Sequence, residues 1–424
     1  MSDYVKLKIQ NIIIKYYLES QDFNGIQIWN LLRTIGKEWN EIKPHILDLI
    51  KSDSIRIIDD EKDINPNIIR VGFDPLEVQL KKANADTPGY MCLYPTKSIL
   101  KKFVDPSDYN SEPYKLRLAL GEAQLSYVSF DLSVLEFYRN DPRYRYENDD
   151  IQGHIYYNDE QLPESDRAFL KTYGFAYDED FNRAVAVFLR YLTGLTPEHQ
   201  QIWKAKELKV NYKLHPGYYR NLITCSWDCK VSICKALLME LYIINIMANA
   251  MGRPPLFNED YGQYGEKRPK RFGFLIRPTL EEFNNFIHLF DKMLSDNINK
   301  EFFQNDISYE IEMKRKDGKI QVQQKGTLKI LDDWIRIFYN THDLRPWEKS
   351  IETLRKIRKM RQTPAHKVNE DQFDQNYFKE QRMIIIDAYL AVRTLRLMFA
   401  THPKVKSTKI EIPDWLEKHQ IWTM

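Results

Sequence analysis

The C-terminal third of the chain contains long segments in which apolar residues recur every three or four positions, and this period constrains the fold more than any other feature. The longest of these segments carries the apolar stripe Ile385, Ala388, Val392, Leu395 and Phe399. A helix with such a stripe buries it against other helices, because the stripe is unfavourable in water. The sequence therefore predicts a helical bundle in this part of the chain.

The predicted bundle spans residues 276–424 and has four long helices. They are expected at 279–303, 327–339, 347–363 and 373–400. A β-hairpin is expected between the first two, at 307–324, because Lys-Asp-Gly-Lys at 316–319 is a typical turn sequence. Thr279 suits the N-terminus of the first helix, because its side-chain oxygen can accept a hydrogen bond from a free backbone N–H group. Asn369, Glu370, Asp371 and Asp374 suit the N-terminus of the last helix.

One charged residue interrupts the apolar pattern of the third predicted helix. At about 100° per residue, Arg361 projects between the directions of Leu354 and Ile357, where a core residue is expected. A guanidinium in that position needs a buried acid, a cleft or an external anion, because leaving it unpaired is costly. Pro364 then interrupts the helix, and His366 follows with an imidazole suited to proton transfer near neutral pH. Arg361 and His366 are therefore the main candidates for a functional site.

Two other arginine–histidine pairs have a similar spacing. Arg336 points away from the apolar stripe of its helix, so its pair with His342 is interpreted as solvated. Arg396 lies at the edge of the apolar stripe of the last predicted helix and is interpreted, together with His402, as a surface residue. Only Arg361 is both central on an apolar face and followed directly by a helix break.

The segment Leu354–Ala391 resembles the signature of HEPN domains (higher eukaryotes and prokaryotes nucleotide-binding). In that family a four-helix bundle carries an arginine, a polar residue and, after a few others, a histidine. Many members are metal-independent endoribonucleases that act as dimers. On this resemblance Arg361 takes the place of the family arginine, Gln362 that of the polar residue and His366 that of the histidine. Gln362 departs from the family pattern, in which Asn, Asp or His is commoner.

RNA cleavage without a metal needs a base for the 2′-hydroxyl proton, an acid for the 5′-oxygen and positive charge near the phosphate. His366 can transfer a proton, and Arg361 can hold the phosphate with a planar fork of donors. Arg358 and Lys367 can add charge along the RNA backbone, although cations near a helix C-terminus also offset the helix dipole. One histidine does not readily serve as both base and acid, so a homodimer that joins two motifs is expected, with a 2′,3′-cyclic phosphate as product.

The structural alternative is an arginine that pairs with an acid such as Asp387 or Glu380, and a histidine that only caps the bend. The third predicted helix offers no acid on the same stripe between Ile351 and Met360, because Glu352 points elsewhere. The functional interpretation of Arg361 is therefore favoured over the structural one.

Residues 1–75 are interpreted as a winged helix-turn-helix module. Its three helices are expected at 5–18, 26–32 and 39–50, and its two wing strands at 54–58 and 68–71. The third helix does not suit a DNA reader, because three of its outward residues are acidic: Glu38, Glu41 and Asp48, against Lys43 and His45. Contact with another protein, or dimerisation, is favoured over DNA recognition for this module.

The middle region, residues 76–275, is expected to be mixed α/β. A strand-like run at 153–157 alternates with helix-like runs at 181–192 and 231–251. The region has no glycine loop for phosphate, no serine nucleophile elbow and no zinc-peptidase helix. The predicted fold class is α+β, mainly α, with three domains that correspond to 1–75, 76–275 and 276–424.

Composition and targeting signals restrict the partners. The formal charge of +2 is nearly balanced, so the chain is not a general coat for nucleic acid. The N-terminus lacks a secretory signal, and the longest apolar stretch, 236–251, contains Glu240 and two asparagines, so a cytoplasmic protein without a membrane span is expected.

The cysteines lack the usual zinc spacing, so reduced thiols and no metal or other cofactor are expected at Cys92, Cys225, Cys229 and Cys234.

These features favour a metal-independent endoribonuclease of HEPN type that acts on RNA as a homodimer. The resemblance alone suggests a setting in antiviral defence or in a toxin system. The alternative is a non-catalytic regulator, in which the winged helix binds DNA or a protein and the helical bundle serves dimerisation. Cleavage of single-stranded RNA by the purified protein in EDTA separates the two hypotheses.

Overall fold

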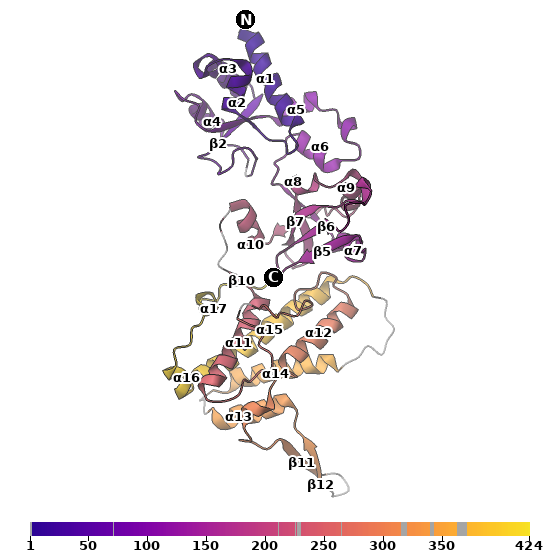
Figure 1. The fold of residues 1–424 in the computed structure, drawn as a ribbon, viewed down its shortest axis with the longest axis vertical. Coiled ribbons are helices and arrows are strands. Elements are labelled where there is room, and N and C mark those ends of the chain that lie inside the picture. The colour runs from indigo at the N-terminus through magenta and orange to yellow at the C-terminus, as the bar shows by residue number, and fades with distance from the viewer. Residues whose placement is uncertain are drawn as a thin grey trace. The chain divides into compact units, whose positions relative to one another are not determined.

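The chain forms two compact units, which are described here one at a time. The computed structural model describes residues 2–424 except 71, 211, 225, 227–229, 264, 315–319, 340–342 and 363–370 (Figure 1). Unit 1 comprises Met1–Glu179 and Ala184–Cys225, and unit 2 comprises Asp180–Arg183 and Ser226–Met424. Helices make up roughly 50% of the chain and strands 15%, which confirms the predicted α+β, mainly α class.

The N-terminal part of unit 1 consists of three helices and a small antiparallel sheet of order β1-β3-β2. The elements are α1 (Ser2–Glu19), β1 (Ile26–Gln27), α2 (Ile28–Ile35), α3 (Trp39–Lys51), β2 (Ile55–Asp59) and β3 (Met91–Pro95). One apolar core joins helices and sheet, and it includes Ile13, Leu31, Ile46 and Leu93. The three helices predicted for this part are therefore present, in the predicted order.

The partner of β2 differs from the predicted one. β2 pairs with β3, with Ile57 opposite Leu93, and the described residues of the run 68–71 form no strand. The backbone N–H of Ile69 donates instead to Oε1 of Gln124 at 2.8 Å, and the Ile69 side chain is buried. The apolar residues of this run are thus buried in a loop. An alternation of apolar and polar residues does not by itself distinguish such a loop from a strand.

The connection between β2 and β3 contains an additional helix, α4 (Leu76–Ala83), which packs against α3. Nε1 of Trp39 donates to the backbone oxygen of Ala85 at 3.0 Å, and Nζ of Lys43 donates to the same oxygen at 3.1 Å. The sheet formed by β2 and β3 therefore extends the N-terminal module beyond residue 75.

The rest of unit 1 is centred on a sheet of order β4-β8-β7-β6-β5, with β9 paired to β7. Its strands are β4 (Tyr127–Phe130), β5 (Tyr144–Asn148), β6 (Gln152–Tyr157), β7 (Leu170–Tyr177), β8 (Arg183–Phe188) and β9 (Lys213–Leu214). The α-helices of this part are α5 (Lys97–Phe103), α6 (Pro113–Ala119), α7 (Glu136–Arg139), α8 (Leu189–Leu192), α9 (Pro197–Lys204) and α10 (Pro216–Tyr219). β6 confirms the strand predicted at 153–157.

The helix predicted at 181–192 is wrong over most of its length. Residues 183–188 form the strand β8, and only Leu189–Leu192 are helical, as α8. Every residue of β8 is buried, so its continuous apolar run fits a strand that is covered on both faces. Short apolar runs of this kind do not distinguish a buried strand from a buried helix by period alone.

A buried histidine in unit 1 belongs to an aromatic cluster around α9. The hydroxyl of Tyr138 lies 2.9 Å from Nδ1 of His199, and the hydroxyl of Tyr144 lies 3.4 Å from its Nε2. Nε1 of Trp203 donates to the Tyr138 hydroxyl at 2.9 Å. Burial lowers the pKa of His199 below its usual value of 6.5, because the charged imidazolium is poorly solvated there.

This lowered pKa predicts that acid weakens unit 1. As pH falls through 6.5, the unfolded chain binds a proton at His199 before the folded unit does, so the stability from the neutral imidazole is lost below that pH. We expect a lower free energy of unfolding at about pH 5.5 than at about pH 7.5, and a smaller difference in His199→Gln. Urea denaturation at both pH values measures this, with His45→Gln as control. An unchanged difference in His199→Gln would contradict the assignment.

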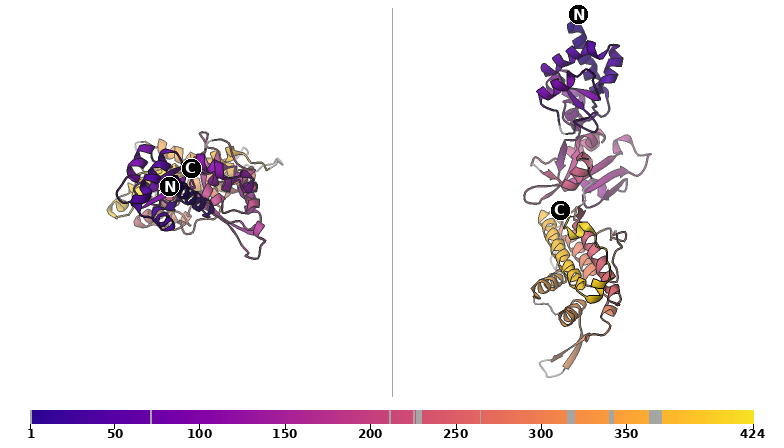
Figure 2. Two further views of the ribbon diagram at one scale, coloured as in Figure 1. Left: turned by 90° about the horizontal axis from the view of Figure 1, so that it is seen from above. Right: turned by 90° about the vertical axis from the view of Figure 1, so that its left-hand side faces the viewer.

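Unit 2 contains, among its described residues, four long helices that pack together. They are α11 (Ile233–Ala250), α12 (Leu280–Leu294), α14 (Arg345–Arg361) and α15 (Gln375–Ala400). α15 packs against α11 and α14, and α12 packs against α14 and α15 (Figure 1 and Figure 2). The fifth helix, α13 (Thr327–Phe338), packs against α14. The first helix of the bundle, α11, therefore comes from the segment that the sequence analysis assigned to the middle region.

Smaller elements complete unit 2. The predicted hairpin is present as β11 (Glu310–Lys314) and β12 (Ile320–Gln324), and its predicted turn at 316–319 lies outside the described residues. The predicted caps are also confirmed, because Thr279 accepts from Glu282 N at 3.4 Å and Asp374 accepts from Asn376 N at 2.9 Å. The remaining elements are β10 (Val231–Ser232), the 3-10 helix η5 (Lys300–Phe303), α16 (Pro403–Ser407), α17 (Asp414–Glu417) and β13 (Ile421–Trp422), and β13 pairs in parallel with β10.

The helix α11 is a core helix of unit 2. In the described part of the chain it is the helix long and apolar enough to cross a membrane, but 72% of it is buried inside the protein. Its Glu240 is fully buried and forms an ion pair with Arg396 of α15, which is also buried. The interpretation of Arg396 as a surface residue is therefore wrong, because the edge of the apolar face of α15 packs against α11 and Arg396 contacts an acid there.

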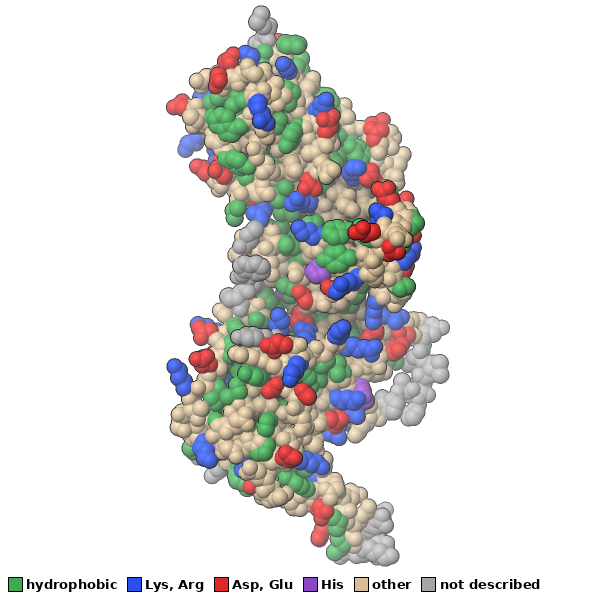
Figure 3. All heavy atoms as spheres, viewed as in Figure 1, with side chains coloured by type: hydrophobic (Ala, Val, Ile, Leu, Met, Phe, Trp, Pro, Cys, Tyr) green, Lys and Arg blue, Asp and Glu red, His purple; other side chains and the backbone are tan. Residues whose placement is uncertain are grey.

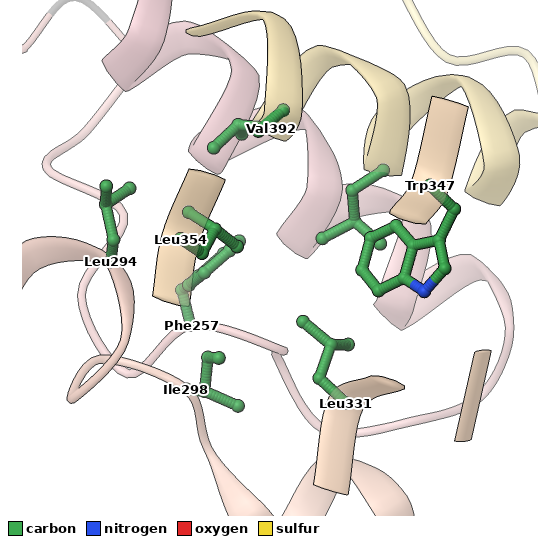
Figure 4. A pocket seen from close by; sticks show the side chains of 9 residues that line it. Phe257, Leu294, Ile298, Leu331, Trp347, Leu354 and Val392 are labelled. Atoms are coloured by element: carbon green, nitrogen blue, oxygen red, sulfur yellow. The ribbon is translucent and has the colours of Figure 1, made fainter. Parts of the chain in front are cut away.

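One small apolar cavity lies inside unit 2. A cavity of about 10 Å³ lies between the helices of unit 2, and Figure 4 shows the apolar side chains around it. The lining residues are Phe257, Leu294, Ile298, Leu331, Trp347, Leu354, Ala391, Val392 and Leu395. A space of this size holds about one water molecule at most, so it offers no room for a substrate. This cavity is therefore part of the packed core and not a binding site.

The tight packing around Leu354 predicts a large cost for its truncation. Leu354→Ala enlarges the cavity, and we expect a loss of about 2–5 kcal/mol in the free energy of unfolding of unit 2. Leu397→Ala is the matched control, because Leu397 on α15 is 47% exposed and its truncation should cost about 0.5 kcal/mol or less. Chemical denaturation measures both variants. Equal losses would contradict the position of Leu354 in the core.

Candidate functional site

Arg361, the last residue of α14, contacts the C-terminal end of α12. Its Nη1 donates to Oδ2 of Asp291 at 2.8 Å and also to Oδ2 of Asp296. The Asp291 side chain is 0% exposed, whereas that of Arg361 is 27% exposed. The acid that meets Arg361 therefore comes from a neighbouring helix, and it is neither Asp387 nor Glu380.

A second arginine strengthens the contact between the two helices. Nη2 of Arg358 lies 3.5 Å from Oδ1 of Asp296, and its Nη1 donates to Oγ1 of Thr327 at 3.4 Å. Leu354, one turn earlier on α14, lines the same cavity as Leu294 of α12. A residue earlier in α14 therefore lies near a residue later in α12, so the two helices are antiparallel.

The Arg361 guanidinium uses only part of its hydrogen-bonding capacity. Both of its ion pairs pass through Nη1, and neither Nε nor Nη2 makes a hydrogen bond to a described residue. Within the same part of the chain, Oδ1 of Asp291 and Oγ of Ser295 are buried without a hydrogen-bond partner. A buried polar atom without a partner costs free energy, so each of these atoms could gain a hydrogen bond from a bound group. Glu240 in the ion pair with Arg396 also has such an atom, Oε1, so these atoms by themselves do not define a functional site.

The charge of Arg361 is permanent. The hydrogen bond to Asp291, and next the one to Asp296, raise the pKa of the guanidinium, so it stays protonated at every physiological pH. Asp291 and Asp296 together balance both Arg361 and Arg358. An anion that binds here therefore competes with the exposed Asp296, while the buried Asp291 keeps Arg361 in place.

The other predicted site residues lie near the end of α14 or outside the described residues. Gln362 directly follows the helix and is exposed, and Arg358 is half-buried one turn earlier. His366 and Lys367 fall within 363–370, which is not described. The structure thus places Arg361, Arg358 and Gln362 together and leaves the two remaining residues as predictions.

The described residues Arg361 and Asp371, on either side of 363–370, both contact α12. At one end, Arg361 is bound to Asp291. At the other end, Oδ1 of Asp371 accepts from the backbone N–H of Glu281 at 3.2 Å. Ten helical residues separate Glu281 from Asp291, which corresponds to roughly 15 Å. The exposed face of α12 therefore extends from one attachment point to the other.

Sequence reasoning missed Asp291, although a signal for it exists. Asp291 follows Ile287 by four positions and precedes Leu294 by three, so it lies on the apolar side of its helix as Arg361 does on α14. Two opposite charges on the apolar sides of two amphipathic helices predict a cross-helix ion pair, because neither charge is stable there alone. The expected partners Asp387 and Glu380 lie on the last helix, whereas Asp291 lies on the first helix of the predicted bundle.

Metal binding has no support in the described part of the chain. No group of three or more His, Cys, Asp or Glu residues there could hold a metal ion. Cys92 and Cys234 are buried, and Cys225 and Cys229 lie outside the described residues. The chemistry of the site is therefore considered from its own side chains.

Comparisons of the chain with models of protein families, with curated proteins and with solved structures give no match. A function is therefore inferred from the geometry around Arg361 and from the motif that contains it. No activity or partner is transferred from another protein by these comparisons.

The ion pair predicts a specific effect of Arg361 on stability. Arg361→Ala leaves the fully buried Asp291 without its cation, and we expect the free energy of unfolding of unit 2 to fall by about 1–3 kcal/mol. Arg345→Ala is the matched control, because Arg345 is exposed at the other end of α14 and pairs with the exposed Asp343. Chemical denaturation compares the two. A cost no larger than that of the control would show that the pair does not hold α14 to α12.

Proposed function

We propose that unit 2 is a HEPN-type endoribonuclease that cleaves RNA without a metal, with Arg361 and His366 as its catalytic residues. The observation that carries the proposal is that the guanidinium of Arg361 uses only part of its hydrogen-bonding capacity. Nη1 is anchored by Asp291, while Nε and Nη2 have no partner among the described residues, on a side chain that is partly exposed. Two adjacent N–H donors held in a known orientation match the geometry of a phosphate.

The proposed reaction uses the RNA itself as nucleophile. A base removes the proton of the 2′-hydroxyl as this oxygen bonds to phosphorus, and the bond from phosphorus to the 5′-oxygen breaks as an acid protonates that oxygen. The products are a 2′,3′-cyclic phosphate and a 5′-hydroxyl. Arg361 stabilises the charge on the phosphate oxygens, His366 transfers a proton, and Gln362, Arg358 and Lys367 contact the substrate.

The proposal includes the setting that the resemblance implies. The enzyme acts in the cytoplasm on RNA, in antiviral defence or in a toxin system. The four helices α11, α12, α14 and α15 suit the bundle of the HEPN family, and a homodimer is the expected assembly. The N-terminal helices with the sheet β1-β3-β2 suit a winged-helix module that holds a partner or a regulatory ligand.

A second candidate is a non-catalytic regulator. It is favoured by the two acids that already neutralise Arg361 and by the acidic outer side of α3. On α3, Glu41 lies 2.6 Å from Nζ of Lys37, and Asp48 lies 4.0 Å from Nζ of Lys6. Such a surface suits a protein partner better than DNA, because the DNA backbone requires net positive charge. In this candidate the bundle serves only dimerisation.

An RNA cleavage assay separates the two candidates. The protein with EDTA should cut single-stranded RNA and leave a cyclic phosphate, and His366→Ala should slow cutting by about 100-fold or more, because a proton-transfer group is lost. Arg345→Ala, far from the motif on α14, should cut at the original rate. Gel analysis of end-labelled RNA measures the rates. Absence of cutting by the folded protein, or cutting that is unchanged in His366→Ala, would favour the regulator.

A further inference from the structure

A short segment of unit 2 concentrates positive charge away from Arg361. Residues 266–271 are Glu-Lys-Arg-Pro-Lys-Arg, with four cations and one acid. Of these cations, Lys267, Lys270 and Arg271 are exposed. On the face of unit 2 that Figure 3 shows, by contrast, Lys and Arg side chains are largely interspersed with Asp and Glu side chains. Residues 267–271 form the basic loop.

The basic loop is fixed to the helical bundle at its C-terminal end. The Phe272 side chain is buried, and its ring stacks on the rings of Phe286 and Phe290 of α12, with centroids 6.5 Å and 5.7 Å away. The next residue is held by α15, because Nε2 of Gln381 donates to the backbone oxygen of Gly273 at 2.9 Å. The residues that follow the loop are therefore part of the packed structure of unit 2.

Turns fix the shape of the loop itself. The backbone N–H of Arg268 donates to the oxygen of Gly265 at 3.0 Å, and that of Phe272 donates to the oxygen of Pro269 at 2.9 Å. Nε of Arg268 also donates to the backbone oxygen of Phe272 at 2.7 Å, and its guanidinium lies 5.6 Å from the centre of the Phe272 ring. One of the four cations thus holds the loop together, and the remaining three are exposed.

The three exposed cations are not neutralised by neighbouring acids. Lys267, Lys270 and Arg271 form no ion pair with any residue that the structure describes. The acid of the segment, Glu266, is folded back toward Gly262, where an added Cβ would lie 2.1 Å from Oε2 of Glu266. The three like charges repel one another, so an anion that binds between them is stabilised.

The surroundings of the basic loop favour a nucleic-acid backbone as this anion. Among the described residues of 261–275, no large hydrophobic side chain is exposed. Segments that bind a membrane surface usually add apolar side chains that enter the lipid, and protein interfaces usually have aromatic or apolar anchors. Nucleic-acid backbones are bound mainly through charge and through hydrogen bonds to phosphate oxygens. Exposed cations without apolar neighbours match this last mode of binding.

We propose that the basic loop binds the phosphate backbone of a single-stranded RNA through Lys267, Lys270 and Arg271. The choice of RNA as the ligand rests on the proposed function, whereas binding at the loop does not require cleavage. A single strand can bend so that neighbouring phosphates meet cations within one short loop, whereas the phosphates of a duplex keep a fixed spacing. Because the loop is already ordered by its turns, it loses little conformational freedom when RNA binds.

The basic loop is a separate contact from the Arg361 site, although both involve α12. The residue after the loop packs on Phe290, and Arg361 binds Asp291. Successive residues of a helix differ in direction by about 100°, so Phe290 and Asp291 face different sides of α12. Removing the charges of the loop therefore leaves the contact between Arg361 and Asp291 in place.

A triple variant, Lys267→Gln with Lys270→Gln and Arg271→Gln, tests this site. Its ligand is a fully 2′-O-methylated single-stranded RNA, which lacks the nucleophile for cleavage. We expect the affinity to fall by about 10-fold or more at about 0.1 M salt, because three phosphate contacts are lost. The slope of log Kd against log salt concentration should decrease by about 2, since each contact with a single strand contributes about 0.7. Fluorescence anisotropy measures both quantities.

The matched control removes the same charge elsewhere in the chain. Lys97, Lys101 and Lys102 are exposed on α5 of unit 1. The triple variant Lys97→Gln, Lys101→Gln and Lys102→Gln should change the affinity by about threefold or less and leave the slope unchanged. An equal loss of affinity in both triple variants would show that only net charge matters, and it would overturn the inference. Circular dichroism checks that both variants are folded.

Other outcomes also decide the inference. It is overturned if the original protein does not bind the methylated RNA, or if the loop variant binds it as tightly as the original. Binding to phosphatidylserine vesicles that depends on the loop, without binding to RNA, would overturn it in favour of a membrane surface.

The inference and the proposed function can fail separately. If the original protein cuts RNA and the loop variant keeps its affinity, the loop is refuted and the proposed function stands. If the original protein binds RNA through the loop and does not cut it, the proposed function fails and the RNA-binding loop stands.

Discussion

The ion pair between Arg361 and Asp291 determines how α14 is placed on α12, and the proposed site depends on that placement. Asp291 is fully buried, so α12 cannot pack stably in this position without a cation from a neighbouring helix. Arg358 adds a second contact to Asp296, and the two arginines together define the register of an antiparallel pair. The end of α14, where the motif begins, is thus held at a defined point of α12.

Similar cross-helix pairs set the other contacts of unit 2. Glu240 of α11 is paired with Arg396 of α15, and both side chains are buried. Asp332 of α13 accepts from Trp347 at 3.1 Å and from Arg355 of α14 at 2.8 Å. Apolar packing alone tolerates many alternative registers, whereas a buried charge is stable only opposite its partner. These pairs therefore specify one arrangement of a bundle whose interior is mainly apolar.

In the proposed function, the position of Arg361 combines a structural and a chemical role. Its Nη1 holds α14 to α12, and its remaining donors are not used by any described residue. An anchored guanidinium loses little freedom when it binds an anion, so the ion pair that stabilises the interface would also prepare the phosphate contact of the proposed reaction.

The amino-acid sequence by itself determined the helices of the bundle, their caps at Thr279 and Asp374, the β11–β12 hairpin and the requirement that Arg361 have a partner. These are local properties, because helical period, capping and turn chemistry depend on residues a few positions apart. Only the tertiary structure decided that the partner is Asp291, that Arg396 is buried against Glu240, and that β8 is a strand. Each of these depends on which segments distant in sequence pack together, and the local pattern of a single segment does not contain that information.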